Sequence, residues 1–522
     1  MNTEAIRNEI PRIETEIGHH KAATEILRQR PTLLTKQLQS NATFSIDALP
    51  PEILSEIFVQ CLPPKGCLMK GEENPLRANS TSLVFAQVCS RWRTIAIQTP
   101  FLWTDIRIHL TSRQRTRGDD GELQTSTLAR QAEKLHVLGQ RSGSCFVNVK
   151  LAGNGGAFCA PDAKLLVTAL QRCSARISVL EVFFGIEGLE AFDNLAAKFD
   201  LHFPTLHTLR LDLDAGFGSA ASSHSGRIKM FSGSQRLRAI MLDVLPSTRL
   251  DLPWSQITHF RGQCYALSQC QQLLRLACNV ESAYFSLFPG ERELVPTDPL
   301  VHNGLKDLTI CECYAPDEEP HVLEYFEFPS LRSFSLSSEN ADPDKNWDSD
   351  SEQVEILPPD CVSAFLRRSP SLQSLTLHTF WESHELDPLA SLGITELKIT
   401  TTSFVVLTDL FGRLGTAPFF LPKLTHLEVE CSERFRHPWS SDFASCVACA
   451  VNGILRRNTS FKTNKPATAN PSPITRLKLT SNWCFPDLSY ILSDLQLADM
   501  RTLKSMGVDI YIGTKRQLER FF

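Results

Sequence analysis

Two closely spaced cysteine pairs are the first residues whose type and spacing could support chemistry. Cys446 and Cys449 have the CxxC spacing that binds zinc or forms a redox-active dithiol. A structural zinc site needs a second pair of ligands, and the sequence offers no second pair at zinc spacing. Cys311 and Cys313 alternate on a predicted strand, so their side chains point to the same side. We therefore expect ordinary thiols at both places and no metal site.

The acidic stretch 342–352 has several oxygen-bearing residues of a calcium-binding loop. Counting from Asp344, the oxygens would come from alternate positions up to Glu352 and then from Glu355. The sixth position is Ser349, where the sharp turn of such a loop requires glycine, and a predicted strand precedes the stretch instead of a helix. We expect a solvated loop here.

Motifs of phosphate binding and hydrolysis are absent from the sequence. It contains no GxxxxGK[ST] phosphate loop, no HExxH metalloprotease motif and no GxSxG nucleophile motif. The glycine-rich segment 153–158 follows a strand, but it lacks the spacing of a phosphate loop, and we predict a turn. We expect no cofactor and no catalytic residue, so the chain is not predicted to be an enzyme.

Composition and charge narrow the class of protein further. The 522 residues are 42% hydrophobic and 21% charged, which is typical of folded proteins. A net charge of −5 argues against general capture of nucleic acid, and we interpret the basic stretch 456–465 as a loop between repeats. We expect no signal peptide and no membrane segment, because the N-terminal sequence lacks an apolar core and no run approaches 18 apolar residues.

The 16 cysteines are scattered, mostly inside apolar runs, as buried free thiols would be. This distribution favours a reducing compartment, and we expect the cytoplasm, the nucleus or both.

The first predicted element is a helix over residues 1–40. Ile6, Ile10, Ile13 and Ile17 recur at spacings of four, three and four, as in a coiled coil. His20 and Thr24 weaken this seam, and Pro11 and Pro31 are expected to break or kink the helix. Two interpretations remain open: weak self-association through residues 1–40, or an amphipathic helix that packs on its own chain or frays.

Two further helices are predicted within residues 44–110. Pro50 and Pro51 stand where a helix can begin, and Ile53, Leu54, Ile57 and Phe58 then form one apolar face. A polar loop of about residues 65–79 follows. The apolar spacing over 80–98 predicts one continuous helix, with an alternating strand at 105–110 after it. Residues 111–144 are interpreted as a linker with a connecting helix.

From residue 145 to 522 one six-residue pattern recurs, which we call the apolar phrase. It consists of an apolar residue, two variable residues, an apolar residue, one variable residue and a third apolar residue. The copies begin at Ile177, Leu206, Leu237, Val280, Leu305, Leu331, Leu372, Ile394, Leu424, Ile474 and Leu503, with a degenerate copy at Ile257. Most copies start 20–31 residues apart, close to the period of leucine-rich repeats. Helix-like stretches lie between several of them, at 162–173, 266–277, 361–370 and 388–393.

This repetition predicts an α/β fold with a curved, mostly parallel sheet, because each unit buries its apolar strand and helix faces only by stacking on its neighbours. The apolar residues of the phrase are expected to be core. The variable residue between the last two apolar ones faces away from the core, so these positions are candidates for a substrate-binding surface. They are Arg210, Met241, Thr309, Ser335, Thr376, Lys398, Glu428 and Lys478.

Residues 44–110 resemble the F-box family, in the form common in mushroom-forming fungi. The resemblance covers about 60 residues of the chain. It rests on Leu49 to Leu54, Ile57, Phe58, Val88, Cys89, Trp92, Arg93, Ile95, Ala96, Pro100, Leu102 and Trp103. The loop between the two predicted helices is longer than the compact form of the family has.

The resemblance implies a non-catalytic subunit of a ubiquitin ligase. An F-box binds a Skp-type adaptor and through it a cullin–RING ligase, and the repeats would hold an unknown protein substrate. The residues implied to contact the adaptor, or to shape that surface, are Leu49, Pro50, Ile53, Leu54, Ile57, Val88 and Trp92. Two alternatives remain: a leucine-rich-repeat scaffold without a ligase role, and a repeat protein that binds a small ligand. A further alternative for the apolar helix residues is that they only dock the helices onto the first repeat.

Overall fold

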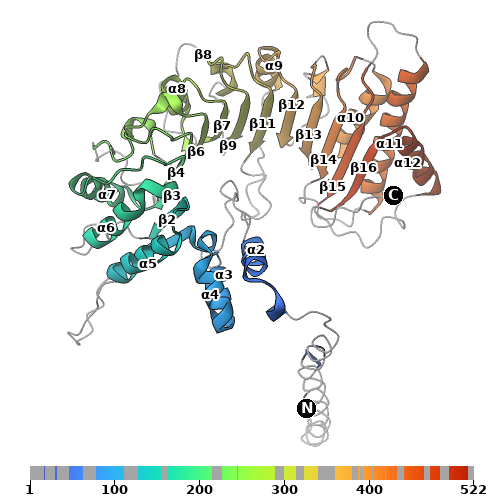
Figure 1. The fold of residues 1–522 in the computed structure, drawn as a ribbon. Coiled ribbons are helices and arrows are strands. Elements are labelled where there is room, and N and C mark those ends of the chain that lie inside the picture. The colour runs from blue at the N-terminus through green and yellow to red at the C-terminus, as the bar shows by residue number, and fades with distance from the viewer. Residues whose placement is uncertain are drawn as a thin grey trace, which may run out of the picture. The chain divides into compact units, whose positions relative to one another are not determined.

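A computed structural model gives the fold of the chain (Figure 1). Apart from scattered positions before residue 45, it describes residues 46–62, 78–110, 127–153, 163–213, 226–243, 245–287, 299–312, 322–338, 359–378, 386–387, 389–390, 392–401, 404–417, 419–431, 440–463, 471–481 and 493–514. Residue contacts divide the chain into two compact units, Met1–Leu102 and Trp103–Phe522. The predicted helix over 1–40, the acidic stretch 342–352 and most of the loop 65–79 lie outside the described residues.

The first unit is helical. Its elements are η1 (Ile46–Ala48), α2 (Pro51–Gln60), α3 (Ala78–Val88) and α4 (Ser90–Gln98), followed by the short η3 (Pro100–Trp103) at the junction. Helix α2 begins as predicted, with Pro51 as its first residue and Glu52 in its first turn.

The prediction of one continuous helix over 80–98 was wrong. Cys89 adopts an extended backbone, with φ −154° and ψ 171°, and separates α3 from α4. Its Sγ atom accepts a hydrogen bond from the backbone N–H of Trp92 at 3.4 Å, so the cysteine caps the N-terminus of α4. Apolar spacing alone hides this break, because the helical period is nearly continuous across it.

The second unit is built on one parallel sheet. Within the described residues, 14 strands pair in the order in which they occur along the chain. They are β1 (Asp105–Leu110), β2 (Val147–Gly153), β3 (Ile177–Phe183), β4 (Thr208–Asp212), β5 (Ala239–Asp243), β6 (His259–Tyr265), β7 (Ser282–Leu287), β9 (Asp307–Glu312), β11 (Ser333–Ser338), β12 (Ser374–His378), β13 (Glu396–Thr401), β14 (His426–Cys431), β15 (Arg476–Ser481) and β16 (Asp509–Thr514). The short strands β8 (Leu300–Val301) and β10 (Phe326–Glu327) pair only with each other.

Helices connect the parallel strands along one side of the sheet (Figure 1). They are α5 (Thr127–Arg141), α6 (Ala163–Cys173), α7 (Ile186–Lys198), α8 (Leu267–Leu276), α9 (Pro359–Arg367), α10 (Phe404–Thr416), α11 (Ser440–Thr463) and α12 (Asp494–Ser505). Shorter 3-10 helices are η5 (Ser174–Arg176), η6 (Ser247–Arg249), η7 (Trp254–Gln256) and η8 (Val322–Tyr325). The predicted helices at 162–173, 266–277 and 361–370 are confirmed as α6, α8 and α9. The stretch 388–393 is not an α-helix where it is described.

The apolar phrase supplies the core as predicted. Its second and third apolar residues lie in register on neighbouring strands, for example Leu308 beside Phe334 and Leu427 beside Leu477. These four side chains are at most 2% exposed. Burial of the whole series in one continuous cluster is the largest favourable contribution to the stability of this unit.

The mixed α/β class is therefore confirmed, but the predicted curvature is not, because the sheet does not curl. A repeat array bends where a uniform helix layer is wider than the strand layer. Here the described connections differ in kind: α5, α6 and α7 precede β2 to β4 and α10, α11 and α12 precede β14 to β16, whereas only the 3-10 helices η6 and η7 lie between β5 and β6, so the covering layer is uneven.

The structure differs from the sequence-based expectation in the start of the sheet, in one predicted loop and in the register of the last strand. The sheet begins at β1, before the predicted start of the repeats at residue 145. The stretch 456–463, predicted as a loop, belongs to α11. The copy beginning at Leu503 was out of register: Leu503 is on α12, and Ile510 and Ile512 fill the core positions of β16. Gly507, with φ 89°, lies between the two elements, in the region that favours glycine.

No helix among the described residues is long and apolar enough to cross a membrane. In the same part of the chain, no group of three or more His, Cys, Asp and Glu side chains is arranged to hold a metal ion.

One buried histidine gives this unit an expected dependence on pH. His302 is 5% exposed, and its Nε2 atom lies 3.4 Å from the Ala277 carbonyl oxygen, while its Nδ1 atom has no hydrogen-bond partner. Burial lowers the pKa of this imidazole, although the Ala277 carbonyl acts in the opposite direction. The folded chain therefore holds His302 neutral, whereas the unfolded chain binds a proton near pH 6.5.

We expect the free energy of unfolding to fall as the pH drops below about 6.5, with a contribution from His302 of up to about 1.4 kcal/mol per pH unit. Denaturant unfolding at pH 7.5 and pH 5.5 measures this loss. His302→Gln removes the titrating group and should show a smaller loss, while His259→Gln, at an exposed position, should behave as the wild type. An equal loss in all three proteins would show that His302 does not contribute.

Candidate functional site

Helix α2 presents an apolar surface. Ile53 and Ile57, one helical turn apart, are 48% and 38% exposed, and Pro50 ahead of the helix is also exposed. Neighbouring exposed apolar side chains make this face of α2 a candidate interface for another protein. The structure thus brings together three of the residues implied by the family resemblance.

The opposite face of α2 forms the interior of the helical unit. Leu54 is 0% exposed, and Phe58 is 1% exposed. The Phe58 ring stacks on Phe85 of α3 with centroids 4.5 Å apart and contacts Trp92 of α4 at 4.8 Å. Leu54 is therefore an interior residue, contrary to its expected place on the contact surface, and Trp92 holds the three helices together.

Two arginines of α4 tie the helices to one another. The guanidinium group of Arg91 donates to the Leu49 carbonyl oxygen just ahead of α2, and Arg93 Nε donates to the Ala86 carbonyl oxygen of α3 at 2.8 Å. Leu49 is only partly exposed. Sequence reasoning missed Arg91, because a backbone carbonyl 42 residues away leaves no mark in the local pattern.

Helix α3 adds a second exposed apolar stripe. Val88, one of the predicted residues, is 56% exposed, and Val84 and Leu83 on the preceding turn are 52% and 43% exposed. The apolar spacing that predicted one continuous helix over 80–98 did not single out Leu83. Phe85 is the α3 side chain that packs against Phe58, whereas Val84 and Val88 do not lie in the interior with Ile95, which is 5% exposed.

The eight candidate substrate residues lie in one row across the face of the sheet opposite the core; Met241 is 9% exposed and the other seven are half-buried. Each pairs in register with the residue on the next strand: Arg210 with Met241, Thr309 with Ser335, Thr376 with Lys398, and Glu428 with Lys478. The alternation of side chains along each strand and the uniform parallel register together place them on one face. Whether this row binds a substrate stays a prediction.

Six residues of the same row were missed. They are Arg107, Lys150, Glu181, Arg261, Tyr284 and Tyr511. Arg107 and Lys150 lie on strands before the first copy of the phrase, and Tyr511 lies on the strand that was predicted out of register. Glu181, Arg261 and Tyr284 occupy the same variable position in copies that the sequence shows. Selecting the variable residue between the last two apolar residues in every copy of the phrase would have identified these three residues.

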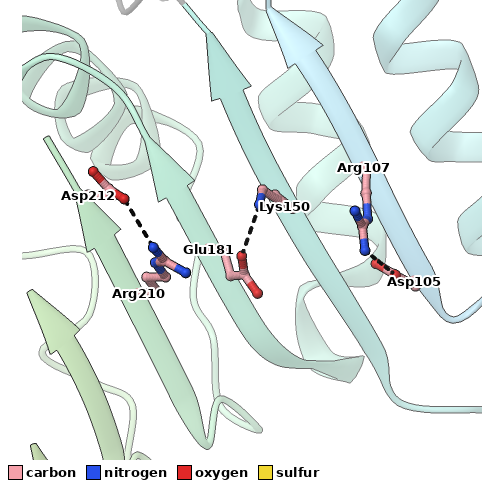
Figure 2. Close-up of polar contacts among 6 residues, drawn as sticks. All are labelled: Asp105, Arg107, Lys150, Glu181, Arg210 and Asp212. Carbon is pink, nitrogen blue, oxygen red and sulfur yellow. Dashed lines mark hydrogen bonds and ion pairs between the residues drawn. The ribbon is translucent and has the colours of Figure 1, made fainter. Parts of the chain in front are cut away.

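Charged contacts dominate the row at its N-terminal end (Figure 2). Lys150 on β2 forms an ion pair with Glu181 on β3, with 3.6 Å between Nζ and Oε2. Arg107 and Arg210 each pair within their own strand, with Asp105 and Asp212 respectively, at 3.2 Å. Figure 2 shows these side chains on the side of the strands away from the helices.

A second charged group lies near the C-terminal end of the row. Glu428 is between two lysines, with Lys398 Nζ at 3.0 Å and Lys478 Nζ at 3.1 Å. Burial alone would raise the pKa of Glu428, but the bonds from both lysines outweigh it and leave the pKa lowered. This acid is therefore charged at neutral pH and offsets the lysines beside it.

A comparison with protein families matches residues 46–109 to the F-box-like family. The matched residues include α2, α3 and α4 with their exposed apolar stripes. No curated protein matches the sequence. The match covers a small part of the chain, and residues 46–109 are an F-box-like domain.

Proposed function

We propose that the chain is the substrate-binding subunit of a ubiquitin ligase, in which the F-box-like domain binds a Skp-type adaptor joined to a cullin–RING ligase. The observation that carries this proposal is the exposed apolar stripe of α2 inside the matched residues 46–109. F-box domains typically bind Skp-type adaptors, and proteins of this kind are typically non-catalytic.

The adaptor would contact Pro50, Ile53 and Ile57 ahead of and along α2, together with Val88 of α3. These side chains are exposed, so the contact needs no rearrangement of the domain. Leu49 lies at the edge of this surface. Leu54 and Trp92 would act from beneath it, by fixing the angle between the helices.

The second unit would carry the substrate. We propose that residues 145–522 are a leucine-rich-repeat-like array whose exposed row contacts a protein substrate. The parallel register and the single strand order support a repeat origin, although the sheet lacks the curvature of such arrays. We also place the protein in the cytoplasm or nucleus, where such ligases work, and expect any self-association through residues 1–40 to be weak.

The alternative is a non-catalytic repeat scaffold without a ligase role. The long segment between α2 and α3 favours it, because the compact form of the F-box lacks such an insertion. Adaptor binding without ubiquitin transfer to any bound protein would indicate this second function.

The test is capture of a purified adaptor–cullin complex by the full chain. The double change Ile53→Glu/Ile57→Glu places two charges on the proposed contact surface, where burial without a partner is costly. We expect at least about a tenfold loss of affinity, equivalent to about 1.4 kcal/mol.

Val405→Glu/Leu495→Glu is the matched control, because these side chains are 68% and 72% exposed on the second unit. It should bind as the wild type does. A wild-type chain that does not capture the complex, or equal losses in both double variants, would rule out adaptor binding through α2. Circular dichroism confirms that each variant is folded.

A further inference from the structure

The row on the sheet face opposite the core has an uneven distribution of charge. Across β1 to β6 it contains four cations, Arg107, Lys150, Arg210 and Arg261, and one anion, Glu181. The row itself therefore has an excess of three positive charges over six neighbouring strands.

The compensating acids lie outside the row. Asp105 is two residues before Arg107, and Asp212 and Asp243 are two residues after the row on β4 and β5. A ligand that follows the row thus meets four cations and one acid, Glu181, which pairs with Lys150 at 3.6 Å, while the other acids lie at its borders. Asp105 is also 45% exposed, so water weakens its pairing with Arg107.

Aromatic rings hold several of these cations in place. Lys150 Nζ and Arg210 Cζ lie 4.3 and 4.8 Å from the centroid of the Phe183 ring, and Arg261 Cζ lies 4.1 Å from that of Tyr284. Such contacts fix a cation in position without neutralising its charge. The side chains are thus prearranged to meet a ligand, which reduces the entropy that binding must overcome.

The spacing of the cations selects the shape of a ligand. Lys150, Arg210 and Arg261 lie on β2, β4 and β6, and strands two apart are separated by about 9.6 Å. A peptide in the polyproline II conformation rises about 3.1 Å per residue with three residues per turn. Every third side chain therefore lies on one face at intervals of about 9.3 Å.

The C-terminal end of the row has a smaller excess of positive charge. Lys398 and Lys478 share Glu428, so the row there has one net positive charge, and Glu430, outside the row, lies 3.9 Å from Lys398. The strands between the two ends present Thr309, Ser335 and Thr376, which are uncharged. An acidic ligand is therefore attracted more strongly to the N-terminal end of the row than to its C-terminal end.

We propose that the row over β1 to β6 binds an extended acidic peptide with a glutamate or aspartate at every third position. Carboxylates of the peptide would pair with Lys150, Arg210 and Arg261, and Met241, 9% exposed, and Phe183 would form the apolar floor between them. The assignment of this peptide to a ligase substrate rests on the proposed function. The binding of the peptide does not depend on that function.

The test is fluorescence anisotropy of the full chain with dye-labelled 12-residue peptides. The probe is Glu-Pro-Pro repeated four times; one comparison peptide has the same composition with its glutamates contiguous, and another has glutamine in their place. We expect the spaced peptide to bind at least tenfold more tightly than either. Adaptor is not needed, so a negative result here is distinct from a negative adaptor capture.

Lys150→Gln/Arg210→Gln should reduce the affinity for the spaced peptide at least tenfold. Lys398→Gln/Lys478→Gln makes the same change in charge at the other end of the row and should change it less than twofold. Equal binding of the spaced and contiguous peptides by the wild type would overturn the proposal, and this comparison needs no variant. Equal losses in the two double variants, or tighter binding of a 12-nucleotide oligo(dT), would overturn it as well.

Discussion

Gly453→Ala is expected to destabilise the second unit by about 1–3 kcal/mol, although alanine is the better helix former by about 1 kcal/mol. Gly453 lies in α11, where a Cβ atom would stand 2.3 Å from the Phe411 carbonyl oxygen and 3.3 Å from the Phe411 Cβ atom. The obstructing atom belongs to the backbone of α10 and cannot turn aside as a side chain can. The two helices would have to separate, and the buried contacts between them would be lost.

Gly412→Ala provides the control for this expectation. Gly412 is in α10, and the position that a Cβ atom would occupy there has no neighbouring atom within 4 Å. Alanine should therefore stabilise the unit by about 0.5–1 kcal/mol. Thermal and denaturant unfolding of both variants measure whether the free energy of unfolding falls with Gly453→Ala and rises with Gly412→Ala. Stabilisation by Gly453→Ala would show that α10 and α11 do not approach each other as closely as the structure has them.

The repeat pattern predicted the core and the exposed row because both depend on short-range periodicity. A strand alternates its side chains between two faces, and identical register repeats that alternation from strand to strand. Leu308, Phe334 and Leu427 could therefore be assigned to the core, and Thr309 and Glu428 to the opposite face, from the sequence alone. The placement of all eight candidate residues in one row follows from the same regularity.

The features that the sequence did not reveal depend on single contacts instead of periodicity. The break between α3 and α4 follows from the extended backbone of Cys89, and cysteine is not among the residues that commonly cap helices. The last strand was misplaced because Leu503 and Met506 have a spacing that a helix and a strand phrase share. The charge pattern of the row emerged only when strands outside the recognised copies placed Lys150 beside Glu181 and Arg107 beside Lys150.

The basic stretch 456–465 shows how a charged residue can be structural. Arg457 was interpreted as part of a solvated loop, yet it is 2% exposed on α11. Its guanidinium group donates to three carbonyl oxygens, those of Ser472 at 3.0 Å, Phe420 at 3.0 Å and Leu421 at 2.8 Å. The arginine thereby joins α11 to the segments that lead into β14 and β15.

Burial lowers the pKa of Arg457 to about 10, which still leaves the group charged at neutral pH. We expect Arg457→Met to lower the free energy of unfolding by about 3–5 kcal/mol, because hydrogen bonds to a charged group contribute about 1.5–3 kcal/mol each and the three carbonyl oxygens would lose their donor. Arg457→Lys keeps the charge but not the planar set of donors, so it should recover only part of this stability.

Arg456→Met makes the same change at the neighbouring, exposed position of α11 and should alter stability by less than about 0.5 kcal/mol. Urea unfolding of the three variants at pH 7 separates these expectations. If Arg457→Met were no more harmful than Arg456→Met, the carbonyl oxygens would have found other donors, and Arg457 would not hold α11 in place. We expect the largest loss of stability from Arg457→Met, a smaller loss from Arg457→Lys and almost none from Arg456→Met. This order follows from the geometry of the guanidinium group and not from its charge alone.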